Sequence, residues 1–211
     1  MSITLFHHPF SRAANVVWML EELGLDYELR YVDIMAGAQK DPAFLALNPM
    51  GKLPTLADGE GDNAVVLTES AAIGMYLADR YGSGTLAPAL DDPARATYLR
   101  WSLFAPSVIE PCSYAHAAQW DYRPGSAGWG TWEAMLASCE AAIGDGPWLL
   151  GDRFTMADVI FGGTVGYMLQ FKMFEERPSF TAYVERLNAR PARKKSTEIN
   201  GRIIAEKGLG S

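Results

Sequence analysis

The sequence predicts an α/β domain over residues 1–81, a linker over residues 82–91 and an all-α domain over residues 92–211. Strand and helix signals alternate throughout the first of these segments. Glycine, serine, proline and aspartate crowd together in the second, and the strand signals end beyond it. Of the 211 residues, 49% are hydrophobic, which is enough for a sizeable core.

Four short segments of the first domain have the apolar or period-two patterns of strands. They lie at residues 3–6, 27–32, 55–57 and 65–67. A helix is predicted between the first two strands, because Ser11 can cap its start and Gly24 is a typical stop. Another is predicted from Ser70 to Gly82. The order β-α-β followed by β-β-α is thioredoxin-like, with one small mixed sheet between helices.

The second domain is predicted to consist of helices, because its apolar residues recur at helical spacing. Asp92 followed by Pro93 is typical of a helix start. Further helices are expected at residues 132–143, from Thr155 onward and at residues 180–187. The basic run at residues 190–195 holds four cations in six residues. We interpret it as a solvated helix end, because cations favour helix C-termini.

Composition excludes several classes of partner. A net charge of -7, a pI near 5.0 and the lack of a Lys/Arg stripe predict no binding to nucleic acid. No segment approaches the roughly 20 apolar residues that span a bilayer, and the start has no signal-peptide pattern, so no membrane association is expected. Cys112 and Cys139 have neither metal-ligand nor disulfide-framework spacing. We therefore expect no metal and a cytoplasmic location.

Four motifs occur in order along nearly the whole chain. They are Ser11-Arg12 with WMLEELGL at residues 18–25, NPMGKLPTL at residues 48–56, LTESAAIGMYL at residues 67–77 and LGDRFTMAD at residues 150–158. Each is weak alone, but their order and intervals together resemble the cytosolic glutathione S-transferase family, in its bacterial type with a serine-like active loop.

The resemblance implies a thioredoxin-like glutathione-binding domain followed by a helical domain, in a cytoplasmic homodimer that acts in detoxification. The implied activity is conjugation of the glutathione thiolate to small hydrophobic electrophiles. Glutathione is then a co-substrate, and no permanently bound cofactor is expected. The alternatives are glutathione-dependent isomerisation or dehalogenation with the same thiolate, and a non-catalytic binding or carrier protein that keeps the fold.

Glutathione carries two carboxylates, an ammonium and a thiol, and its site needs complementary groups. Glu69 and Ser70 stand at a predicted helix start, where free N–H groups and a partial positive charge suit a carboxylate. Ser70 adds a hydroxyl donor, and Glu69 can accept from the ammonium. In isolation the pair would be interpreted as an ordinary N-cap beside an exposed acid.

The segment around Pro54 is the second part of the expected site. The resemblance implies a cis peptide bond between Leu53 and Pro54, and a Leu53 backbone that pairs with the cysteinyl part of glutathione. It also implies that Lys52 meets the glycine carboxylate and that Lys40 shares this task. Taken singly, each lysine would be read as a solvated surface charge.

Ser11 is the candidate catalytic residue. A thiol becomes a nucleophile as its thiolate, and a hydroxyl at a helix start can donate to the sulfur. The competing role of Ser11 is that of an N-cap, which needs only its acceptor lone pair. His7 and His8 precede this helix and could help to deprotonate the thiol, or could simply pack at the strand end. Backbone N–H groups at the helix start are a further candidate.

The resemblance also implies a second-substrate pocket between the domains. Its expected lining residues are Phe10, Phe104, Tyr114, His116 and Trp120. Aromatic, partly apolar walls of this kind suit hydrophobic electrophiles. By contrast, Thr155 and Asp158 fit a Thr-x-x-Asp capping box, so we assign Asp158 to folding and not to catalysis.

Overall fold

The computed structural model describes residues 2–210 and divides the chain into two compact units. One unit contains the residues up to 77 together with those from 190 onward, and the other contains residues 78–189. The strands are β1 (Ile3–His7), β2 (Glu28–Tyr31), β3 (Thr55–Asp58) and β4 (Val65–Thr68). The helices are α1 (Ala13–Leu23), α2 (Pro42–Leu45), α3 (Ser70–Tyr81), α4 (Arg95–Phe104), α5 (Glu110–Ala117), α6 (Trp132–Ile143), α7 (Met156–Gln170), α8 (Pro178–Asn188) and α9 (Pro191–Lys207).

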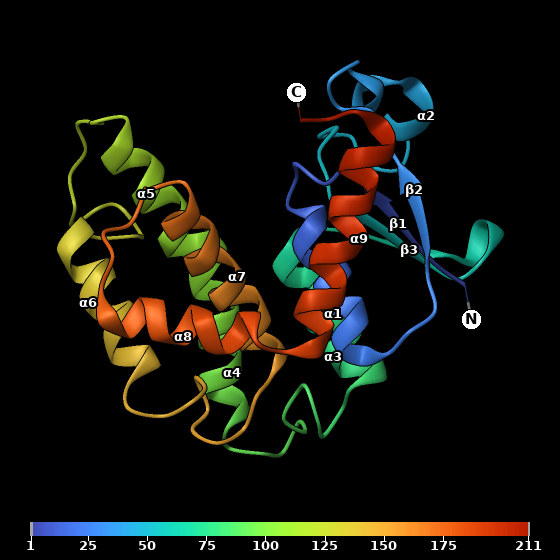
Figure 1. Ribbon diagram of the computed structural model, residues 1–211. Coiled ribbons are helices and arrows are strands. Elements are labelled where there is room, and N and C mark those ends of the chain that lie inside the picture. The colour runs from blue at the N-terminus through green and yellow to red at the C-terminus, as the bar shows by residue number, and fades with distance from the viewer. Residues whose placement is uncertain (1, 211) are drawn as a thin grey trace. The chain divides into compact units, whose positions relative to one another are not determined.

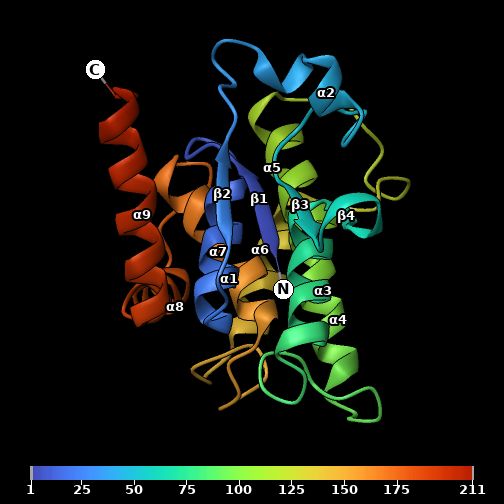
Figure 2. The same ribbon diagram turned by 90° about the vertical axis from the view of Figure 1, so that its right-hand side faces the viewer.

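The sheet of the first unit has the strand order β2-β1-β3-β4 (Figures 1 and 2). β1 pairs in parallel with β2 and antiparallel with β3, and β4 pairs antiparallel with β3. This is the mixed sheet that the order of elements predicted, and it confirms the thioredoxin-like fold. The four predicted strands are present, and each boundary differs by at most one residue.

The two faces of this sheet have different neighbours, because successive side chains of a strand point in opposite directions. Phe6 packs edge-on against Phe44 of α2, with their ring centroids 5.7 Å apart. His7 follows Phe6 and therefore points to the opposite face. There the buried side chains of α1, among them Val16 and Leu20, complete the core.

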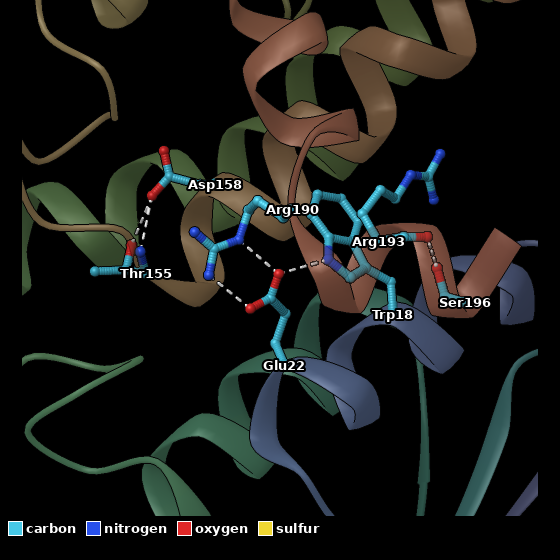
Figure 3. A network of polar contacts seen from close by, with 7 residues as sticks. All are labelled: Trp18, Glu22, Thr155, Asp158, Arg190, Arg193 and Ser196. Carbon is cyan, nitrogen blue, oxygen red and sulfur yellow. Dashed lines mark hydrogen bonds and ion pairs between the residues drawn. The ribbon is translucent and has the colours of Figure 1, made fainter.

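Helix α9 packs along α1, so the end of the chain belongs to the first unit (Figure 1). The sequence had placed residues 190–211 in the helical domain. In Figure 3 the carboxylate of Glu22 lies between the indole of Trp18 and the guanidinium of Arg190. Trp18 Nε1 donates to Glu22 Oε1 over 2.8 Å, and Arg190 donates to both oxygens over 2.6 and 2.7 Å. Side-chain contacts between remote segments therefore decide where the last helix goes.

The interpretation of the basic run as a solvated helix C-terminus is wrong. Residues 190–195 begin α9 instead of ending a helix. Arg190 pairs with Glu22, whose side chain is only 5% exposed, and Lys195 pairs with Glu21 over 2.7 Å. Arg193 lies over the Trp18 ring, 4.9 Å from its centroid. These contacts outweigh the unfavourable helix dipole, which is worth only about 0.3–1 kcal/mol at a surface.

The second unit is a packed set of helices with α7 at its centre. Phe161 of α7 makes edge contacts with Trp101 of α4 and Tyr183 of α8, at centroid distances of 5.8 and 6.3 Å. A π-helical turn at residues 105–109 separates α4 from α5, and Pro106 lies within it. The helices expected at residues 132–143 and 180–187 and from Thr155 onward are confirmed.

The start of α7 carries the predicted capping box, with Thr155 at the N-cap and Asp158 three residues later (Figure 3). Asp158 is fully buried. Its Oδ2 accepts from the Thr155 N–H over 2.9 Å, and its Oδ1 accepts from the Leu149 N–H and the Tyr183 hydroxyl over 2.8 and 2.9 Å. Burial raises the pKa of this carboxyl, and the donors around it act in the opposite direction. Asp158 thus ties α7 to α8 and to the preceding loop.

None of the helices that the structure describes is long and apolar enough to cross a bilayer. The described residues also contain no group of three or more histidine, cysteine or acidic side chains that could hold a metal ion.

Candidate functional site

Three segments that the sequence singled out meet at one edge of the sheet. In the strand register, Phe6 of β1 is opposite Thr55 of β3, and Thr55 is opposite Thr68 of β4. The chain leaves β1 after this row toward Ser11, enters β3 just before it through Leu53 and Pro54, and leaves β4 just after it into Glu69 and Ser70. The register therefore brings all three segments to the same edge.

The start of α3 presents unsatisfied polar groups. The carbonyl of Glu69 accepts from the Ile73 N–H over 2.9 Å, so Glu69 occupies the N-cap position and Ser70 opens the helix. The N–H groups of the first turn then have no partner within the helix. The Ser70 Oγ is buried and has no hydrogen-bond partner within residues 2–210. Glu69 is exposed and has a φ of 67°, a left-handed conformation that is uncommon outside glycine.

The loop before β3 is held by an internal set of hydrogen bonds. Asn48 Nδ2 donates to the Lys52 carbonyl over 2.9 Å, and Thr55 Oγ1 donates to the same carbonyl over 3.3 Å. Lys40 Nζ donates to the Met50 carbonyl over 3.2 Å, so the Lys40 ammonium lies at the same loop as Lys52. The bond between Leu53 and Pro54 is cis, as expected. Lys52 belongs to this loop and Lys40 bonds to it, so two cations lie at the loop that enters β3.

The Ser11 hydroxyl makes two hydrogen bonds at the start of α1. It donates to the His8 carbonyl over 2.8 Å and accepts from the Ala13 N–H over 3.2 Å. Ser11 thus has the acceptor role of a cap, although the formal N-cap is Arg12. Its proton is directed at a backbone carbonyl. A hydroxyl can rotate to another acceptor, so donation to a sulfur exchanges one hydrogen bond for another and leaves the Ala13 contact in place.

The two histidines before Ser11 are buried and neutral at neutral pH. Burial lowers the pKa of His7 to about 4, against a smaller raising effect of its hydrogen bond with Asn200. Burial also lowers the pKa of His8, whose Nδ1 accepts from the Phe10 N–H over 3.1 Å. The remaining proton of neutral His8 is therefore on Nε2, which is buried and lacks a partner in the described chain. Both rings are weak bases, which disfavours them as acceptors of the thiol proton.

The five residues expected around a second substrate differ in exposure. Phe10, Tyr114 and Trp120 are 56%, 42% and 57% exposed, which is high for aromatic side chains. Phe104 packs against Trp101, with centroids 4.9 Å apart. His116 stacks on Trp132 at 4.0 Å with an interplanar angle of 5°. The last two are already engaged in packing within their unit.

Comparison with known proteins decides the family. The glutathione S-transferase N-terminal domain matches residues 1–79, and the glutathione S-transferase C-terminal domain matches residues 113–186. Glutathione S-transferase 3 of Zea mays is 33% identical to this chain, over 92% of each sequence. The chain belongs to the glutathione S-transferase family.

Solved structures of other family members have the same fold. A glutathione transferase of Phanerochaete chrysosporium, in complex with oxidized glutathione, is 27% identical and covers 95% of this chain and 97% of its own, with a TM-score of 0.79. A family member from Pseudomonas fluorescens with two glutathione bound is 28% identical, over 93% of this chain and 92% of its own, with a TM-score of 0.72.

Two residues that support the site in this family member escaped the sequence analysis. Asn48 was named only as the first residue of the motif at residues 48–56, although its side chain donates to the Lys52 carbonyl. Asn200 contacts His7 across 193 positions of the chain. A signal for Asn48 exists, because an asparagine before proline and glycine often bonds its own loop. A lone asparagine in a polar helix gives no such signal.

Proposed function

We propose that this chain binds glutathione at the sheet edge described above and transfers it, as thiolate, to small hydrophobic electrophiles. The observation that carries the proposal is the register of Phe6, Thr55 and Thr68, which gathers Ser11, Leu53 and Ser70 around one edge. The bound glutathione in the related structures from Phanerochaete and Pseudomonas supports the same ligand.

The charges of glutathione match the groups at this edge. The γ-glutamyl carboxylate accepts from the Ser70 hydroxyl and the free N–H groups of the first turn of α3, where the helix dipole favours an anion. The exposed carboxylate of Glu69 pairs with the ammonium. Lys40 and Lys52 meet the glycine carboxylate at the other end of the tripeptide. The backbone of Leu53, between these ends, pairs with the cysteinyl residue as an added strand does.

Ser11 stabilises the thiolate in this proposal. Its hydroxyl turns from the His8 carbonyl to the sulfur, while the Ala13 N–H continues to donate to the Ser11 oxygen. That second bond polarises the hydroxyl and makes it a better donor. The thiol proton leaves to solvent, because His7 and His8 are too weakly basic to hold it. The sulfur then forms a bond to the electrophilic carbon, which releases a leaving group or passes its electrons to an adjacent atom that takes up a proton.

The proposal separates anchoring from activation, and two alanine variants test the separation. Ser70→Ala should weaken glutathione binding by about 1.5–3 kcal/mol, the value of a hydrogen bond to a charged group, measured by titration calorimetry.

Ser11→Ala should leave affinity nearly unchanged, lower turnover of a chromogenic electrophile, and move the thiol titration midpoint toward that of free glutathione. Ultraviolet absorbance of the thiolate reports this midpoint in the complex.

Ser138→Ala is the matched control, because Ser138 lies on α6 and its hydroxyl donates only to the Ala134 carbonyl of its own helix. It should behave as wild type in all three measurements. Ser11→Ala with an unchanged midpoint and full turnover would reduce Ser11 to a cap. Retention on immobilised glutathione without turnover of any electrophile would favour the carrier alternative.

A further inference from the structure

Helix α9 contacts the last residue of β1 through one side chain. His7 Nε2 and Asn200 Oδ1 are 2.7 Å apart, and the His7 side chain is fully buried. His7 stands four positions before Ser11, where the chain leaves the sheet for the loop of residues 8–12. The contact therefore lies directly before the loop that carries the candidate catalytic residue, Ser11.

The direction of this hydrogen bond follows from the other contacts of the Asn200 amide. Its Nδ2 donates to the Ser196 carbonyl over 2.8 Å and reaches the Ala14 carbonyl at 3.5 Å. Because the nitrogen faces two carbonyls, the oxygen faces His7 and must accept. The neutral His7 ring therefore carries its proton on Nε2. Its Nδ1 is left as a buried lone pair without a partner in residues 2–210.

Asn200 touches both ends of the loop that holds Ser11. Its oxygen accepts from His7 at the end of β1, and its nitrogen approaches the Ala14 carbonyl in the first turn of α1. Within the loop, the His8 carbonyl accepts from both the N–H and the hydroxyl of Ser11. The direction of the Ser11 hydroxyl thus depends on the position of His8, which follows directly on the ring that Asn200 holds.

We propose that Asn200 is a positioning residue for Ser11: by accepting the Nε2 proton of His7 and bridging β1 to α1, it fixes the loop that aims the Ser11 hydroxyl. The proposal rests on the proposed function of Ser11 in thiolate stabilisation. It gives α9 a part in the chemistry of the site in addition to its packing.

Helix α9 has other attachments, which allow the role of Asn200 to be isolated. Arg190 and Lys195 pair with Glu22 and Glu21 of α1. These ion pairs should keep α9 in place when Asn200 is replaced. Lys195→Ala is the matched control, because it removes a contact between the same two helices and leaves His7 untouched.

Hydrogen exchange and the thiol titration together test the proposal on the full-length protein. Asn200→Leu removes the acceptor at similar size, so amide exchange in residues 7–14 should quicken about tenfold. The midpoint of bound glutathione should rise by about one pH unit, a tenfold change in ionisation constant, with little change in affinity. Asn200→Asp keeps the oxygen acceptor for His7 but loses the amide donor toward the Ala14 and Ser196 carbonyls, so its exchange should lie between those of wild type and Asn200→Leu. Lys195→Ala should retain wild-type exchange in this segment.

Nitrogen NMR adds a direct readout, since the chain has only three histidines to assign. Wild type should show His7 neutral with its proton on Nε2, and Asn200→Leu should lose this single form. The proposal is overturned if Asn200→Leu keeps both wild-type loop exchange and the wild-type midpoint. If wild type itself shows no lowered midpoint, the proposed function fails, and the exchange of Asn200→Leu alone then decides whether Asn200 positions the loop.

Discussion

The first residues of α7 and of α3 are both polar, but their hydrogen bonding differs. At α7, both oxygens of the buried Asp158 accept hydrogen bonds from protein donors. At α3, the buried Ser70 hydroxyl has no partner within the described residues, and Glu69 stands exposed in a left-handed conformation. Buried polar groups are almost always paired, so an unpaired one beside a residue in a left-handed conformation supports the proposal that a ligand binds at the start of α3.

The same difference predicts which polar groups contribute to the free energy of unfolding and which contribute to ligand affinity. A polar group whose partners are all in the protein contributes to folding, because removing it leaves buried donors unmet. A polar group that lacks partners makes no comparable contribution to folding stability, so its removal should affect only the affinity for a ligand at that place. Substitutions at Asp158 and at Glu69 test this division.

Asp158→Ala should destabilise the protein by about 3–5 kcal/mol, because it leaves the Leu149 N–H, the Thr155 N–H and the Tyr183 hydroxyl buried without an acceptor. Urea unfolding followed by tryptophan fluorescence measures the loss. Glutathione affinity of the folded fraction should stay at its wild-type value. Asp152→Ala removes an exposed acid nearby and should have little effect on either quantity. A thermally normal but inactive Asp158→Ala would assign this acid to function instead.

His7 predicts how stability depends on pH. Its pKa is about 4 in the folded protein and 6.5 when unperturbed, so between these values the unfolded chain binds the proton more tightly. Stability should therefore fall as the pH falls through this window, and the His7 contribution amounts to about 3 kcal/mol in total. Burial of His8 acts in the same direction.

His7→Gln cannot take up this proton, so its unfolding free energy should vary less between pH 7 and pH 4 than that of wild type. Urea unfolding at a series of pH values gives both curves. Parallel curves for the two proteins would show that His7 titrates normally in the folded state. In that case the buried, neutral ring on which the loop geometry depends is not present in solution.

The sequence correctly predicted the elements whose signals lie in neighbouring residues. Strand alternation, Gly24 and the Thr155 capping box depend on neighbouring residues, and each of the corresponding elements was placed correctly. The meeting of these segments at one sheet edge could also be predicted, because the resemblance assigns the motifs around Leu53 and Ser70 to one ligand.

The position of α9 could not be predicted from local sequence patterns. Its cations sit at the unfavourable end of a helix, and what holds them is Glu21, Glu22 and the ring of Trp18, about 170 positions away. No periodicity encodes such a pairing. The same is true of Asn200, whose partner His7 lies on the first strand. Long-range polar contacts were thus the part of the fold that the sequence alone did not yield.

The smallest effect predicted is a gain in stability at Glu69. A non-glycine residue at a φ of 67° costs roughly 1 kcal/mol or more in backbone energy, whereas glycine adopts this conformation freely but loses about 0.5–1 kcal/mol in chain entropy on folding. Glu69→Gly should therefore stabilise the protein slightly, by about 0.5 kcal/mol. It should also weaken glutathione binding, because the carboxylate that pairs with the ammonium is gone.

Gln119 provides the matched control for this change. It has a φ of 52°, is exposed, and follows α5 in the other unit. Gln119→Gly should give the same small gain in urea unfolding with no loss in calorimetric affinity for glutathione. If Glu69→Gly binds as wild type does, the left-handed residue is only a turn and the unpaired groups of α3 do not face a ligand. If it loses both binding and stability, Glu69 supports the fold in the way that Asp158 does, and the division between the two helix starts breaks down.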